Sequence, residues 1–265
     1  MTARRFTWLG ASLLSAALLA GCVSSPAVKQ DGELAVSSDK ADRQKRAAIR
    51  LQLAIGYYQQ GQMNIALDEI KLALQTDSEF ADAYSMAGLI YMDMGETRLA
   101  EENFTRAIRL APNDPDLSNN YGWFLCQNGR ASLSIAYFEA AIRNKAYQSP
   151  AKALNNAGTC SMILKDAAAA ERYFNEAFRY EPGNPTTNTN LARMNYDRGD
   201  FERARFYIVR VTKADVLSAE VLWLAVKIER KMGDRAAESS YATQLRRRYP
   251  NSNEFSAYQR GAFNE

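Results

Sequence analysis

Cysteine is the most reactive residue type in this 265-residue sequence, which contains three cysteines and no histidine. Without histidine the chain can form neither a Ser-His-Asp triad nor a His-ligated zinc site, and three cysteines are too few for a four-cysteine metal site. The sequence also has no glycine-rich phosphate loop and no nucleophile beside a base at a recognisable spacing. We therefore expect no enzymatic activity, and neither a metal nor a cofactor bound to the chain.

Two of the cysteines, Cys126 and Cys160, stand 34 residues apart. This separation equals the length of an internal repeat described below, so the two side chains fall on neighbouring copies of one structural unit. We interpret them as a disulfide, formed in a compartment that permits such bonds. Two buried free thiols are the alternative, because the two repeat positions differ and disulfide geometry is demanding.

The third cysteine, Cys22, closes an N-terminal leader. Two arginines precede the apolar run Phe6–Ala20, which is the order found in signal peptides. The last residues, Leu19-Ala20-Gly21-Cys22, resemble the lipobox of bacterial lipoproteins, in which the cysteine thiol receives a diacylglycerol and becomes the mature N-terminus. An ordinary apolar leader that happens to contain a cysteine is the alternative.

The lipobox resemblance implies a signal peptide over residues 1–21 and a covalent lipid on Cys22. Because Val23 follows the cysteine, it also implies sorting to the outer membrane, with the protein facing the periplasm and held by membrane lipid. Residues 22–46 are rich in Ser, Asp, Lys and Ala and lack a helical apolar stripe. We expect them to form a flexible, lipidated tether.

The charge balance limits the classes of partner. Lys and Arg total 33 against 30 Asp and Glu, a net charge of +3, and removal of the two leader arginines leaves +1. A nearly neutral chain is not expected to bind nucleic acid by neutralising phosphates. The 47% of hydrophobic residues suffices for a sizeable core, while the only long apolar run lies in the leader, which excludes a transmembrane bundle. We expect a monomer.

The rest of the chain is built from an internal repeat. Gly61, Gly95 and Gly129 stand 34 residues apart, as do Gly199 and Gly233. Alignment on these glycines gives six repeats, which cover residues 47–80, 81–114, 115–150, 151–184, 185–218 and 219–250. A single helical pair cannot bury its apolar face alone, so neighbouring repeats must share one continuous core.

The second repeat shows the pattern most clearly. Its large and small residues follow the order Tyr84, Ala87, Gly88, Tyr91, Gly95, Ala100, Phe104, Ala107, Pro112. This order resembles the tetratricopeptide repeat, a helix–turn–helix unit. The resemblance implies an all-α, right-handed superhelix of six repeats with a concave groove. Phe255, Tyr258 and Ala262 recur at helical spacing within residues 251–265, which predicts a capping helix after the last repeat.

Polar residues recur at groove positions of three consecutive repeats. Asn120, Asn156 and Asn190 each occupy position six of their repeat. Stacked repeats would align these amides in a row, and an amide offers both a donor and an acceptor to the backbone of an extended peptide. The alternative is that the three side chains bridge neighbouring helices without contacting a partner.

The first two repeats present a different face to the groove. Apolar residues occupy predicted groove positions there, namely Leu51, Ile55, Tyr58, Leu89 and Met92. An exposed apolar strip of this kind usually marks a partner site, although residues 42–46 or the tether could instead fold over it. We expect Trp123 and Trp223 at the groove edge, where tryptophan is a favoured interface residue.

Some stretches are more specific than the repeat pattern. They are Asn119-Asn120-Tyr121-Gly122-Trp123-Phe124-Leu125-Cys126, Ala157-Gly158-Thr159-Cys160 and Arg247-Arg248-Tyr249-Pro250-Asn251-Ser252. With the lipobox and six repeats, they resemble the PilF/PilW family of type IV pilus biogenesis lipoproteins. The family implies a pilotin, which binds pilus secretin subunits and promotes their outer-membrane localisation and multimerisation. The alternative is a scaffold lipoprotein that organises cell-wall enzymes or the outer-membrane protein assembly machine.

Overall fold

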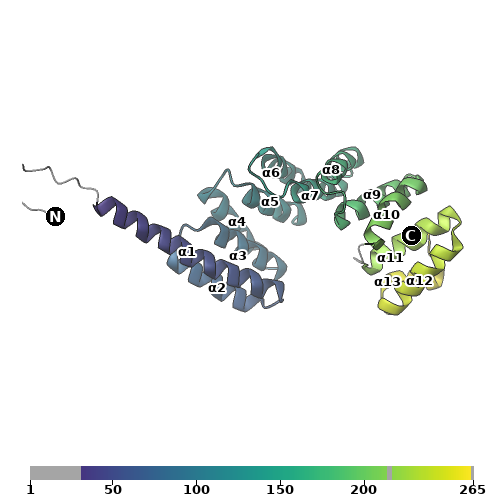
Figure 1. Cartoon of the computed structure of the whole chain (residues 1–265), viewed down its shortest axis with the longest axis horizontal. Helices are drawn as coiled ribbons and strands as arrows, with labels where there is room; N and C mark the ends of the chain where they lie inside the picture. Colours follow the sequence, from purple (N-terminus) through teal and green to yellow (C-terminus); the bar gives the residue numbers. More distant parts are fainter. Residues whose placement is uncertain (1–30, 214–216, 264–265) are drawn as a thin grey trace, which may run out of the picture. The chain divides into compact units, whose positions relative to one another are not determined.

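A computed structural model describes residues 31–213 and 217–263 of the chain. All regular structure in these ranges is helical, with thirteen helices and no strand, so the predicted all-α class is confirmed (Figure 1). Their bounds are α1 Asp31–Gln59, α2 Met63–Thr76, α3 Ala81–Asp93, α4 Thr97–Leu110, α5 Pro115–Gln127, α6 Ala131–Arg143, α7 Pro150–Ile163, α8 Ala167–Tyr180, α9 Pro185–Asp197, α10 Phe201–Lys213, α11 Ala219–Met232, α12 Arg235–Arg248 and α13 Asn253–Arg260. The signal peptide and the lipidation site Cys22 lie outside the described residues.

The helices pack in pairs that follow the repeats. In each repeat from 81–114 to 219–250 the first helix packs on the second, and the second helix then packs on the first helix of the next repeat. Residues 42–265 form one compact unit by this packing, while the part of α1 before residue 42 belongs to a separate unit. None of the described helices combines the length and apolarity needed to cross a membrane.

The first helix departs from the sequence prediction. We expected a flexible tether up to residue 46 and a first repeat from residue 47, but α1 is continuous from Asp31 to Gln59. The tether prediction is therefore wrong for residues 31–46. The reason is that a helix needs no apolar stripe to continue: residues 33–46 contain neither glycine nor proline, so the helix extends from the packed turns that begin near Ala47, which is fully buried.

Left-handed turns join most first helices to their partners. Gly61, Gly95, Gly129, Gly199 and Gly233 all have φ between 73° and 80° at these joints. Glycine adopts this region without strain, which explains the 34-residue spacing. In the fourth repeat the same joint is made by Lys165, with φ of 61°, the one non-glycine residue with positive φ in the described chain.

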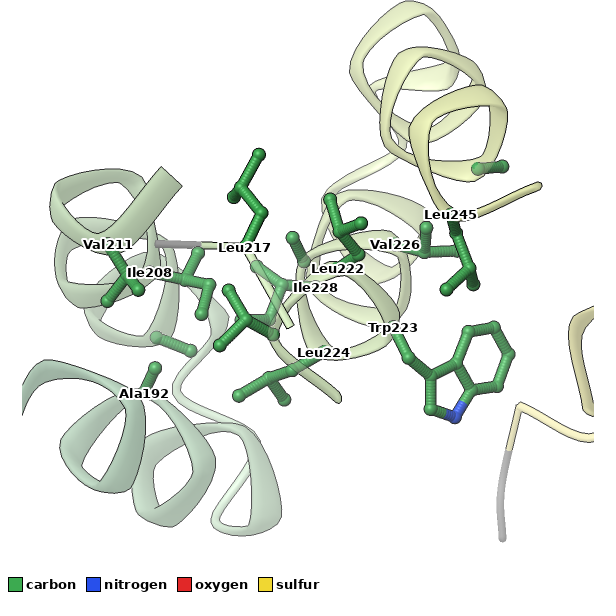
Figure 2. Packing of buried hydrophobic residues seen from close by; sticks show 14 residues of the cluster. Ala192, Ile208, Val211, Leu217, Leu222, Trp223, Leu224, Val226, Ile228 and Leu245 are labelled. Carbon is green, nitrogen blue, oxygen red and sulfur yellow. The ribbon is translucent and has the colours of Figure 1, made fainter. Parts of the chain in front are cut away.

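The interior consists of small clusters shared between adjacent repeats. Figure 2 shows the largest of those described, in which Ile208 and Val211 of α10 face Leu222 and Ile228 of α11, with Leu245 of α12 on the other side. All five side chains are at most 1% exposed. Each cluster therefore depends on helices of two neighbouring repeats, as expected for a stacked array.

Candidate partner-binding cleft

A cleft of about 340 Å³ opens over the first helices of the first three repeats. Its walls come from α1, α3 and α5, and it is lined by Leu51, Gln52, Ile55, Asp82, Ser85, Met86, Leu89, Asp114, Asp116, Leu117 and Asn120. Four of the nine predicted groove residues meet in it, namely Leu51, Ile55, Leu89 and Asn120. We take this cleft as the candidate functional site.

Helical spacing explains why these residues converge. Leu51 and Ile55 lie one turn apart on α1, as do Ser85 and Leu89 on α3 and Asp116 and Asn120 on α5. Residues four apart share one face of a helix, so each helix contributes one short column of side chains.

The apolar lining is only partly exposed. Leu51 is 7% exposed and Met86 is 8% exposed, while Ile55 and Leu89 are half-buried. We predicted an exposed apolar strip, and for Leu51 this is wrong, because its side chain forms part of the floor beneath the half-buried residues.

Three carboxylates give the cleft an acidic rim. Asp82 lies in the first turn of α3, Asp116 lies in the first turn of α5, and Asp114 precedes α5 and accepts a hydrogen bond of 3.0 Å from the backbone N–H of Leu117. Burial raises the pKa of Asp82, and the charges of Asp114 and Asp116 raise it further. Burial and Asp114 also raise the pKa of Asp116, while Lys152 acts in the opposite direction. The rim is thus a site of mutual repulsion between like charges.

Two of the three predicted asparagines belong to one polar network. Asn120 donates a hydrogen bond to Ser85 Oγ at 3.2 Å, and its Oδ1 accepts from Asn119 Nδ2 at 3.3 Å. Asn156 donates to Asn119 Oδ1 at 2.9 Å, and Lys152 Nζ lies 3.5 Å from Asn120 Oδ1. The network links α3, α5 and α7. It therefore has the bridging geometry that we gave as the alternative to a peptide-binding row.

The other predicted groove residues lie outside the cleft. Asn190 lines a separate cleft of about 260 Å³, beside the ion pair of Arg193 and Glu220. Tyr58 donates a hydrogen bond to Asp93, and burial, together with this bond, raises the pKa of Tyr58 to about 12. Met92 and Trp123 pack partly buried against core clusters of the second to fourth repeats.

Cys126 of α5 and Cys160 of α7 form a disulfide in the structure, with their Cα atoms 5.9 Å apart. Both residues are buried, at 2% and 0% exposure. The bond ties the helix that forms one wall of the cleft to the next repeat.

The chain itself covers groove positions of the last repeats. Trp223 is 8% exposed because Tyr258 of α13 and Phe263 pack against its ring, with centroid distances of 6.3 and 5.3 Å. Tyr196 of α9 lies with its hydroxyl 3.5 Å from the carbonyl oxygen of Phe263. Helix α13 lies within the predicted capping segment and packs on α11 and α12.

Sequence reasoning missed the acidic rim. Asp82 and Asp116 both stand at position two of their repeats, a position that commonly points into the groove of tetratricopeptide arrays. Their position in the repeat therefore predicts that both side chains face the groove, but only apolar, tryptophan and asparagine residues were predicted to line it. A larger hollow of about 780 Å³, between α2 and α4 over Ala87 and Tyr91 of α3, was not anticipated either.

Comparison with known proteins identifies the repeat. Two family models match the chain, both described as tetratricopeptide repeat, over residues 85–149 and 162–226. The repeat type inferred from the order of large and small residues is therefore confirmed.

Relatives extend the likeness to most of the chain. The type IV pilus assembly protein PilF of Pseudomonas aeruginosa is 28% identical over 241 residues, which cover 91% of this chain and 93% of that protein. The crystal structure of PilW, a widely conserved type IV pilus biogenesis factor, is 30% identical and superposes with a TM-score of 0.72, covering 80% of this chain and 98% of PilW. The structure of Pseudomonas aeruginosa PilF is 26% identical and superposes with a TM-score of 0.75, covering 83% of this chain and 99% of PilF. On this evidence the chain belongs to the PilF/PilW family of tetratricopeptide-repeat proteins of type IV pilus biogenesis.

Proposed function

We propose that this protein is a pilotin: an outer-membrane lipoprotein that binds secretin subunits of the type IV pilus and promotes their localisation and multimerisation at that membrane. The cleft over α1, α3 and α5 is the observation that carries the proposal. The cleft is open, has an apolar floor and is built from the first helices of three repeats. The relatives of the chain are named as type IV pilus assembly and biogenesis proteins.

The anchor and the cleft have complementary roles in this proposal. A lipidated Cys22 gives the molecule membrane affinity, since each buried methylene contributes about 0.8 kcal/mol and several chains act together. The cleft holds one segment of a secretin subunit. Because both contacts are made by one molecule, the subunit is concentrated at the membrane, where a ring must form.

Crosslinking in cells tests the cleft. A photoreactive amino acid placed at Ile55 or Leu89 should capture the secretin, because both side chains are half-buried in the cleft. Leu133, which is 58% exposed on α6 and does not line the cleft, is the matched control position and should not capture it. Capture of cell-wall enzymes or of the outer-membrane assembly machine instead would favour a scaffold lipoprotein.

Removal of the lipid tests the anchor. In a Cys22→Ala strain the repeat array should still fold, while secretin multimers in the outer membrane decrease several-fold, measured by quantitative blotting of membrane fractions. A deletion strain sets the lower limit for this measurement. If secretin multimers remain abundant in the outer membrane of the deletion strain, the pilotin proposal is wrong.

A further inference from the structure

The acidic rim of the cleft forms no ion pair with the lysines and arginines that the structure describes. The ion pairs found between described side chains join arginines to other carboxylates, and none of them involves Asp82, Asp114 or Asp116. Asp114 caps α5, so the N-terminus of that helix offsets part of its charge, but no cationic side chain of the described residues pairs with it. The three carboxylates therefore line one cleft beside an apolar floor, with Asp82 and Asp116 exposed to water and Asp114 half-buried.

Two neighbouring groups complete the electrostatic surroundings. Lys152 of α7 attracts Asp116, but its Nζ lies beside Asn120 rather than in an ion pair. Tyr147, which precedes α7, is buried, and burial together with the charges of Asp116 and Asp114 raises the pKa of its hydroxyl well above its usual range. Neither group removes the repulsion among the carboxylates, so a further positive charge at the rim would be stabilised by all three.

We propose that the cleft selects a polypeptide segment in which apolar side chains are flanked by lysine or arginine, the apolar side chains packing on Leu51, Met86 and Leu89 and the cation meeting the rim. This inference rests on the proposed function and gives the chemistry of the secretin segment that it requires. Charge complementarity to the rim is the reason for this choice of occupant.

The dimensions of the cleft limit the segment. Pockets that hold small ligands measure about 300–1,000 Å³, so a cleft of about 340 Å³ accepts a few anchoring side chains and not a whole helix. A short segment with two or three apolar residues next to one or two cations fits both the floor and the rim.

A peptide array tests this proposal with the full mature chain. Overlapping 15-residue peptides would tile the secretin of the same organism, each beside a twin in which Lys and Arg are replaced by Gln. A second set would hold unrelated 15-residue sequences that range from acidic to basic at equal apolar content. We expect the bound peptides to combine apolar and basic residues, and their neutral twins to bind about tenfold more weakly.

Variants assign the effect to the rim. The Asp82→Asn/Asp116→Asn chain should lose the same tenfold factor for basic peptides and should no longer distinguish them from their twins. Asp114 is left unchanged because it caps α5. The control chain Asp68→Asn/Glu79→Gln removes the same number of charges outside this cleft and should bind like the unmodified chain. Circular dichroism checks that both variants fold.

The outcomes separate the two proposals. Secretin peptides that bind equally well with and without their cations would overturn the charge requirement and leave the pilotin proposal intact. If unrelated basic, apolar peptides bind through the rim while no secretin peptide binds, the pilotin proposal is overturned and the charge requirement of the cleft is kept. No binding to any peptide would overturn the inference about the cleft.

Discussion

At the scale of single residues, the two helices of each repeat pack through side chains of complementary size. Position eight of a repeat faces position twenty-four, and the two sizes are complementary: Gly88 meets Phe104, Gly122 meets Phe138 and Gly158 meets Phe174. In repeats one and five the corresponding pairs are Ala54 with Ile70 and Ala192 with Ile208, and in repeat six they are Val226 with Ala242. Because interiors are close-packed, a larger residue on one helix requires a smaller one on its partner.

Substitution of Gly158 tests this complementarity. A Cβ atom at this position would lie 2.6 Å from Cε1 of the fully buried Phe174 ring, so Gly158→Ala should lower the free energy of unfolding by about 1–2 kcal/mol despite the better helix propensity of alanine. Adding Phe174→Ile recreates the Ala and Ile pair of repeats one and five and should recover part of the loss. Urea denaturation of the two single variants and the double variant measures the coupling.

Gly56 provides the matched control. It lies within α1, and apart from its chain neighbours and the nearby backbone of α1, no atom lies within 4 Å of a Cβ built there. Gly56→Ala should therefore stabilise the protein by about 0.5–1 kcal/mol. Equal effects of Gly158→Ala and Gly56→Ala would show that the close contact with Phe174 has no energetic consequence.

At the scale of helices, one arginine joins three elements. Arg205 of α10 reaches Glu229 of α11 at 3.0 Å and Asp234, the N-cap of α12, at 2.8 Å. Glu229 is 1% exposed, and burial raises the pKa of its carboxyl, an effect that Arg205 opposes. The ion pair therefore connects the fifth repeat to the sixth and compensates a charge that the core could not otherwise hold.

Loss of Arg205 should destabilise the C-terminal repeats. Arg205→Ala leaves Glu229 buried without its cation and should lower the free energy of unfolding by about 3 kcal/mol at neutral pH. A carboxyl whose pKa is raised in the folded state binds a proton more tightly there than in the unfolded chain, so the defect should shrink as the pH falls through that raised pKa. Thermal melts of the unmodified protein and of Arg205→Ala, from neutral pH down through the pKa of Glu229, measure this difference in stability.

Arg203→Ala is the control for Arg205→Ala. Arg203 is exposed and its Nε lies 3.8 Å from Asp200, so its removal should change stability by at most about 0.5 kcal/mol at any pH. A pH-independent loss in Arg205→Ala, equal to that of Arg203→Ala, would contradict the role given to the buried pair.

At the scale of the whole molecule, the repeat and its period were open to prediction, and the position of the cleft was not. Glycine at five of the six joints within repeats, and side chains of complementary size where the two helices of a repeat meet, are local requirements, so the sequence shows them directly. Position within the repeat also placed Leu51, Ile55, Leu89 and Asn120 on one face. Which part of that face stays open depends on distant residues, since Phe263 and Tyr258 cover Trp223 and an amide network engages Asn156. The extent of α1 was missed because a helix can continue without a buried face.

The disulfide should stabilise the junction between the third and fourth repeats. In a stacked array each repeat contacts only its neighbours, so local unfolding can begin at any weak junction. The Cys126–Cys160 bond adds a covalent link between repeats three and four, and a loop of this length should contribute about 2–4 kcal/mol. Reduction should therefore lower the unfolding midpoint, and hydrogen exchange should accelerate in α5 to α8 more than in α11 and α12.

The Cys126→Ala/Cys160→Ala chain separates the bond from other effects of the reductant. It should match the reduced protein in stability and should not respond to reductant. Because α5 forms one wall of the cleft, loosening this junction should also weaken peptide binding in both the reduced protein and the variant. If mass spectrometry confirms reduction while exchange in α5 to α8 and peptide affinity stay unchanged, noncovalent packing alone holds this junction, and the cleft does not depend on the bond.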